Sequence, residues 1–182
     1  MKNKQSLYKW LYETYENDLF SYGIAFGISK ELLEDAIHDV FLHLYEREHK
    51  LWESQNMKFY LLNCLKNRIR TIKKKEMNTE FLEEGSDNYS FLIEVNGFEL
   101  IDEEKERAAM QKQLKKMLDS LTDRQREAVY LRYTQGLSYE EIGKLMGIQP
   151  KAAQKLVYRA IELQMRKIQP QIIYFFLFGY FL

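Results

Sequence analysis

The residues with the clearest capacity for chemistry lie near the C-terminal end of the chain, between Lys151 and Arg159. Cationic, amide and phenol side chains recur there at the spacing of one outer helix face: Lys151, Gln154, Lys155, Tyr158 and Arg159. The residues between them supply an apolar stripe for burial: Ala153, Leu156, Val157, Ala160 and Ile161. Such an outer face can contact DNA phosphates and base edges. The same pattern also suits a helical hairpin with a solvated, charged face.

The elements around this face have clear start and stop signals. Each of two capping boxes pairs a hydroxyl residue with a side chain three positions later: Thr122 with Gln125, and Ser138 with Glu141. Gly147 is placed to end the helix that follows Ser138, and Pro150 to open the next one. A short helix, a glycine-containing turn and a second helix with a basic face predict a helix-turn-helix.

A second basic surface is predicted on a helix that begins near Met57. Its inward positions are Leu62, Leu65, Ile69 and Ile72, and its other face carries Asn63, Lys66, Asn67, Arg70, Lys73 and Lys74. The nearby aromatic residues Trp52, Phe59 and Tyr60 could stack on unpaired bases, as in proteins that hold single strands, or could simply pack in a core.

Two further helices are predicted before this one. The first has Leu7, Leu11, Tyr15, Leu19 and Tyr22 on one face. The second follows Ser29 and has Leu33, Ile37, Val40 and Leu44 on one face, with acidic residues clustered toward its start. Because no alternating strand pattern stands out, the predicted fold class is all-α, with two small helical domains.

Composition limits the functions that the chain can have. The 182 residues include 27 basic and 27 acidic side chains, so DNA binding would depend on local clusters of positive charge. The single cysteine, Cys64, excludes an intrachain disulfide and is predicted to be a buried, inert thiol. The N-terminal residues lack the apolar core of a signal peptide, so the protein is expected to be cytoplasmic.

The sequence gives no support for an enzyme or a metal protein. His38, with Glu34 one turn before it, could form half of a metal site, but no second helix with matching ligands follows. We find no Ser-His-Asp arrangement, phosphate loop or cysteine pair. The prediction is therefore a protein with no catalytic residues, metal or cofactor.

Three segments together resemble a known family. The family is the extracytoplasmic-function (ECF) class of bacterial RNA polymerase sigma factors. Its region four resembles the segment SLTDRQREAVYLRYTQGLSYEEIGKLMGI. Its polymerase-binding helix resembles LLEDAIHDVFLHLYE, and its promoter-melting helix resembles KFYLLNCLKNRIRTIKKK. The resemblance covers residues 5–76 and 105–168. His38 replaces the usual Gln and Thr71 a frequent Asp, while Ala152 and Ala153 replace a Thr-Val pair, so promoter preference does not transfer.

This resemblance implies a transcription initiation factor that binds core RNA polymerase and directs it to promoter DNA. The implied polymerase-binding residues are Asp35, Asp39, Val40, Phe41, Leu44 and Tyr45. The helix-turn-helix would read the upstream (−35) element with Lys151, Ala152, Gln154, Lys155, Tyr158 and Arg159. The N-terminal domain would melt the downstream (−10) element with Lys66, Asn67, Arg70, Lys73 and Lys74. An anti-sigma protein is a further implied partner.

The predicted domains are residues 1–76 and 105–168. Residues 77–104 form an acidic segment that is expected to be a flexible, solvated tether. Residues 169–182 form a hydrophobic tail that is expected to dock within the chain, on a regulator or on a membrane surface.

Two other functions stay open at this point. A dimeric helix-turn-helix regulator, with an N-terminal half for sensing or dimerisation, predicts a symmetric DNA site. A membrane-associated interaction protein that depends on the hydrophobic tail predicts binding to vesicles.

Overall fold

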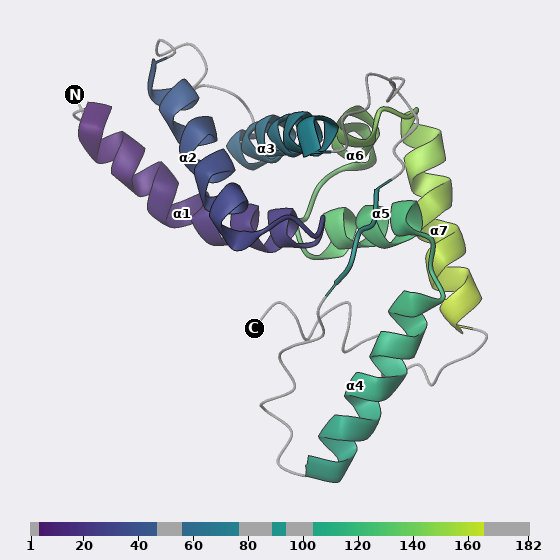
Figure 1. Cartoon of the computed structure of the whole chain (residues 1–182). Coiled ribbons are helices and arrows are strands. Elements are labelled where there is room, and N and C mark those ends of the chain that lie inside the picture. The colour runs from purple at the N-terminus through teal and green to yellow at the C-terminus, as the bar shows by residue number, and fades with distance from the viewer. Residues whose placement is uncertain (1–3, 47–55, 77–88, 94–103, 166–182) are drawn as a thin grey trace. The chain divides into compact units, whose positions relative to one another are not determined.

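The computed structural model describes residues 4–46, 56–76, 89–93 and 104–165, which contain seven α-helices and no strand (Figure 1). The chain divides into two compact units, Met1–Ser90 and Phe91–Leu182. The all-α fold class is confirmed. As far as the described residues go, none of the helices combines the length and hydropathy that a bilayer span requires.

The N-terminal unit consists of three mutually packed helices, α1 (Lys4–Ile24), α2 (Lys30–Glu46) and α3 (Met57–Glu76). The predicted apolar faces largely form its core, because ten of those positions are almost inaccessible to solvent. Leu7, Tyr15 and Ile72 are only half-buried. The buried positions are Leu11, Leu19, Tyr22, Leu33, Ile37, Val40, Leu44, Leu62, Leu65 and Ile69.

The turn between α1 and α2 depends on close packing. A Cβ atom at Gly23 would lie 2.2 Å from Cδ1 of Leu33, so any larger residue would force the Leu33 side chain to move. Ser29 Oγ then accepts a hydrogen bond from the Leu32 N–H at 3.3 Å and caps α2.

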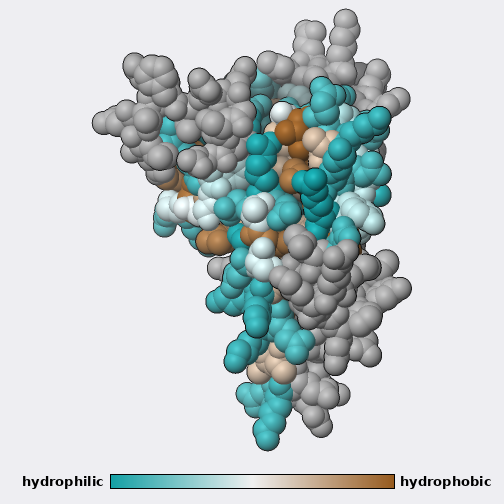
Figure 2. All heavy atoms as spheres, turned by 90° about the vertical axis from the view of Figure 1, so that its right-hand side faces the viewer, coloured by the Kyte–Doolittle hydropathy of each residue, from teal (hydrophilic) through white to brown (hydrophobic). Residues whose placement is uncertain are grey.

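The C-terminal unit contains α4 (Glu104–Asp119), α5 (Asp123–Tyr133), α6 (Tyr139–Met146) and α7 (Pro150–Met165). Helix α7 packs against both α5 and α6. The end of α4 joins this core, while its outer surface, at the bottom of Figure 2, is mainly hydrophilic. One buried cluster links α4, α5 and α7: Leu114, Met117, Leu118, Leu121, Val129 and Ala160.

Arg126 of α5 is the main polar contact inside this unit. Its side chain is 7% exposed, and its guanidinium donates hydrogen bonds to the carbonyl oxygens of Leu118 at 2.9 Å, Leu121 at 2.8 Å, and Phe91. It also pairs with the Asp123 carboxylate at 3.2 Å. Arg126 therefore links the last turn of α4 to the residues that follow it and to the segment that contains Phe91.

Residues 89–93 depart from the expected solvated tether. Phe91 is fully buried, its N–H donates to Asp123 Oδ1 at 2.7 Å, and its ring packs edge-on against Tyr130 with 5.6 Å between ring centroids. Ile93 packs against the buried cluster of the same unit. The remainder of the predicted tether before Glu104, residues 77–88 and 94–103, and the tail 169–182 lie outside the described residues.

Arg126→Met should lower the free energy of unfolding of the C-terminal unit by about 3 kcal/mol, because three buried carbonyls would lose a charged donor. Urea denaturation followed by circular dichroism would measure the loss. Arg159→Met, which removes an exposed guanidinium on α7, is the matched control and should change stability by less than about 0.5 kcal/mol. Equal stability of the two variants would contradict the role given to Arg126.

Candidate nucleic-acid interface

The predicted caps of the helix-turn-helix are both present. Thr122 Oγ1 accepts from the Gln125 N–H at 3.3 Å, while the Gln125 side chain accepts from the Thr122 N–H at 3.0 Å. Ser138 and Glu141 make the equivalent pair at the start of α6, at 3.2 and 2.8 Å. The predicted boundaries at both helices are confirmed, since reciprocal caps satisfy two otherwise unpaired N–H groups.

The turn between α6 and α7 is fixed by two glycines. Gly147 ends α6 with a left-handed backbone, φ 66°, as predicted. Gly143, inside α6, faces the returning chain so closely that a Cβ atom there would lie 2.8 Å from the Ile148 carbonyl oxygen. The Ile148 N–H in turn donates to the Gly143 carbonyl at 2.8 Å. This backbone contact sets the path by which the chain enters α7.

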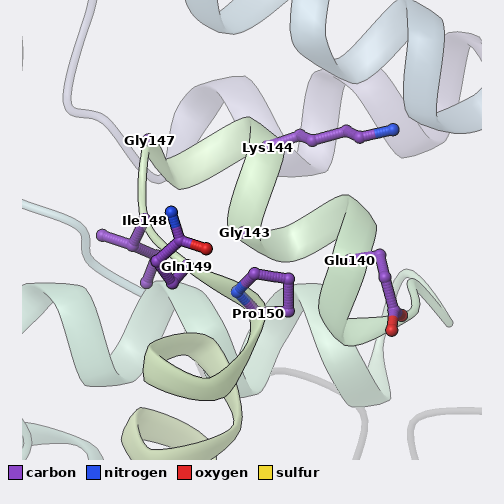
Figure 3. A pocket seen from close by; sticks show the side chains of 7 residues that line it. All are labelled: Glu140, Gly143, Lys144, Gly147, Ile148, Gln149 and Pro150. Atoms are coloured by element: carbon purple, nitrogen blue, oxygen red, sulfur yellow. The ribbon is translucent and has the colours of Figure 1, made fainter.

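A shallow groove of about 550 Å³ lies on this turn (Figure 3). Its lining includes Glu140 and Lys144 of α6 together with Ile148 and Pro150. The Lys144 side chain extends away from the turn. The groove follows from the close approach at Gly143.

Helix α7 presents the predicted outer face to solvent. Lys151, Gln154, Lys155, Tyr158 and Arg159 are all exposed, Tyr158 by 67%, and Ala152 is half-buried. Lys151, Lys155 and Arg159 are spaced four residues apart and so follow one line along the helix. Of the predicted inward stripe, Ala153, Val157 and Ala160 are buried, whereas Leu156 and Ile161 are only half-buried.

The basic face of α3 differs from the prediction at one position. Lys66 was expected to face outward but is 1% exposed, with Nζ 5.1 Å from the ring centroid of Tyr89 and 6.0 Å from that of Phe26. Its burial has a physical reason, since the two rings can accommodate an amine. Lys73 is half-buried and donates to the Phe26 carbonyl.

The remaining basic and amide residues of α3 are accessible. Asn67 and Lys74 are exposed and Arg70 is half-buried, so three of the five predicted downstream-element residues can meet a ligand. Phe59, Tyr60 and Cys64 are half-buried, which for Cys64 is less than expected, and Trp52 lies outside the described residues.

Helix α2 divides its predicted polymerase-binding residues between two faces. Val40, Phe41 and Leu44 are core residues, at 6%, 0% and 0% exposure. Phe41 packs against the rings of Tyr8 and Tyr12, with centroids 6.1 and 4.8 Å away. Their side chains therefore hold α2 in place.

The outer face of α2 carries a continuous stripe. Glu31 and Asp35 lie at its acidic end, His38 lies in the middle, and Leu42 and Tyr45 form its apolar end, exposed by 44% and 38%. We call these five residues the α2 outer stripe.

Two carboxylates of α2, those of Glu31 and Asp39, make contacts with neighbouring residues. Two hydrogen bonds to the carboxylate of Glu31 lower its pKa, so this group stays charged. The larger effect comes from the N–H of Glu31 itself and the smaller from the Ser29 side chain. Asp39, on the edge of the stripe, forms an ion pair with Arg68 of α3 and is half-exposed. Within the described ranges, no group of three or more acidic, histidine or cysteine side chains could hold a metal ion.

The chain is similar in sequence and in fold to known proteins. Residues 111–163 match the family Sigma-70, region 4. The ECF RNA polymerase sigma-E factor of Haemophilus influenzae is 22% identical over 147 residues, which is 79% of this chain and 78% of that protein. Because the match spans 79% of the chain, it must include parts of both units, and a regulator that shared only the helix-turn-helix would not match in this way.

Residues 111–163 thus belong to the Sigma-70, region 4 family, and the chain as a whole is similar to ECF sigma factors. Two solved structures have a similar fold. RpoE, in complex with the anti-sigma factor NepR from Bartonella quintana, aligns with a TM-score of 0.59 at 21% identity and covers 85% of this chain and 92% of its own. CnrH, in complex with the cytosolic domain of CnrY, aligns with a TM-score of 0.52 at 15% identity, covering 92% of each chain.

The family match lies on the helix-turn-helix of the C-terminal unit. Sigma factors are transcription factors and not enzymes. Sequence reasoning missed the roles of Arg126, Phe91 and Tyr89. The isolated aromatic residues in an acidic segment were the one available signal for the last two.

Gly143→Ala should destabilise the C-terminal unit by about 1–3 kcal/mol, because the added methyl would force the Ile148 carbonyl to move. It should also weaken duplex binding, since that carbonyl lies where the chain enters α7. Thermal unfolding and filter binding would measure the two effects. Lys144→Ala, at the exposed neighbouring position, should leave stability nearly unchanged, and a stable, fully active Gly143→Ala would refute the close-contact account.

Proposed function

We propose that this sigma factor binds core RNA polymerase through the α2 outer stripe, reads the upstream promoter element as a duplex with α7, and captures an unpaired strand of the downstream element on α3. The observation that carries this proposal is the presence, on two separate units, of an exposed recognition face and a second accessible basic helix face. Each face suits a different state of the DNA.

The stripe suits a protein partner because it joins charge to exposed apolar area. Interfaces combine a few apolar or aromatic anchors with a polar rim. Leu42 and Tyr45 can supply the anchors, while Glu31 and Asp35 can pair with basic residues of the polymerase. Val40, Phe41 and Leu44, which the sequence resemblance placed in this interface, would support it from the core.

Helix α7 suits a duplex. A helix fits the major groove of B-DNA, where amide and guanidinium groups can read base edges. Lys151, Lys155 and Arg159 can divide between phosphates and bases, with Gln154 and Tyr158 beside them. The half-buried Ala152 would contribute apolar contact only.

Helix α3 suits an unpaired strand. Holding a strand open costs stacking and pairing energy, which contacts made only to the exposed strand can offset. Asn67, Arg70 and Lys74 are accessible for such contacts, whereas Lys73 is engaged with the Phe26 carbonyl. The helix-turn-helix alone would bind duplex DNA and would not favour opening.

An anti-sigma protein is a further partner in this proposal. RpoE was solved in complex with the anti-sigma factor NepR, and CnrH in complex with the cytosolic domain of CnrY. Such a partner would inhibit this chain by covering its polymerase-binding or DNA-binding faces.

Charge reversal in the α2 outer stripe should abolish polymerase binding. We expect Asp35→Arg combined with Leu42→Glu to reduce co-purification with bacterial core RNA polymerase by at least about tenfold, because it removes both an acid and an anchor. Glu13→Gln, an exposed change on α1 that alters the net charge by the same +1, is the control and should bind normally. If the folded wild-type protein did not bind core polymerase, the proposed function would be wrong.

The two DNA-binding faces should separate into different steps. With a promoter selected from a random library, Asn67→Ala with Lys74→Glu should reduce opening, seen as permanganate reactivity of unpaired thymines, by about tenfold and closed-complex formation much less. Lys155→Ala with Arg159→Ala should instead weaken closed-complex formation. Lys9→Glu on α1 controls for charge. Parallel losses in both steps by both pairs would contradict the division of roles.

A further inference from the structure

Tyr89 lies against an unusual surface of the N-terminal unit. Its half-buried ring packs on Phe26 with 5.2 Å between centroids and an interplanar angle of 48°. The Lys66 amine lies 5.1 Å from the centre of the same ring. Tyr89 belongs to a described segment, residues 89–93, that has no helical or strand structure.

The surface beneath Tyr89 combines aromatic and cationic groups from two elements. Lys66 of α3 and Phe26, which follows α1, are both almost fully buried. Lys73, two turns after Lys66, donates to the Phe26 carbonyl. Lysine side chains are rarely this buried without a specific contact, so the position of Tyr89 explains part of the burial of Lys66.

This arrangement matches the chemistry that holds an unpaired base. Proteins that bind single strands stack bases on aromatic rings and place amines or guanidinium groups beside the phosphates. Phe26 offers such a ring and Lys66 such an amine. Asn67, Arg70 and Lys74, which are accessible on α3, can continue the contact along the strand.

We propose that Phe26 and Lys66 form a stacking site for an unpaired base and that Tyr89 occupies this site until nucleic acid displaces it. The proposal rests on the proposed strand capture by α3 and adds a site and an internal competitor to it. A flat ring from a non-helical segment can leave the surface without unfolding a helix. The half-buried phenol of Tyr89 thus occupies the position of a base and leaves it when nucleic acid binds.

The test uses the full-length chain and a labelled single-stranded DNA of random sequence, about 12 nucleotides long, because base stacking tolerates any sequence. Fluorescence anisotropy would compare wild type with three variants. Tyr89→Ala should bind about tenfold more tightly than wild type, since the competitor is gone. Tyr89→Phe, which keeps the ring, should bind like wild type. Lys66→Met in the Tyr89→Ala background should remove the gain.

A second measurement uses a chain with an unaltered fold. With 3-fluorotyrosine at position 89, the fluorine NMR signal should move from its packed position toward that of a free tyrosine as the oligonucleotide is added. Binding without a change in this signal would overturn the proposal while leaving strand capture by α3 intact. Unchanged or weaker binding by Tyr89→Ala would also overturn it. Co-purification with core polymerase reports on the proposed function independently of either result.

Discussion

The C-terminal unit depends on the buried guanidinium of Arg126. Its hydrogen bonds to the carbonyls of Leu118, Leu121 and Phe91 join the end of α4, the following loop and an upstream segment to α5. Guanidinium suits this role because its donors diverge in one plane and it remains charged. The recognition helix α7 packs on α5 and therefore takes its position from the same framework. A polar interaction inside the core thus supports the helix that carries the exposed cationic line.

Glycine and capping residues determine how α6 and α7 meet. The backbone contact between Gly143 and Ile148 brings the chain back against α6, and the left-handed Gly147 turns it there. A larger side chain at Gly143 would separate the two segments. The apolar residues Ala153, Val157 and Ala160 of α7 then face inward and leave its cationic line in solvent, so the exposed face of α7 consists of residues that take little part in folding.

In the N-terminal unit, burial separates residues that look alike in the sequence. Val40, Phe41 and Leu44 carry the family resemblance of α2, yet they fill the core, while the outer stripe beside them is exposed. On α3, Lys66 is enclosed while Asn67, its neighbour, is exposed. Only the neighbouring elements make this distinction, because helical periodicity does not reveal which other side chains cover a given face.

The sequence by itself determined the all-α class, the capping boxes, the turn at Gly147 and the exposed face of α7. Each of these depends on local spacing or on the conformational freedom of single residues, which a linear pattern records. The tertiary structure alone decided the burial of Lys66 by Tyr89 and Phe26, the docking of Phe91, and the bonds of Arg126. Lys66 lies 40 positions from Phe26 and 23 from Tyr89 in the sequence, and Arg126 lies 35 positions from Phe91. Such pairs meet only after helices have packed, so no local signal encodes them.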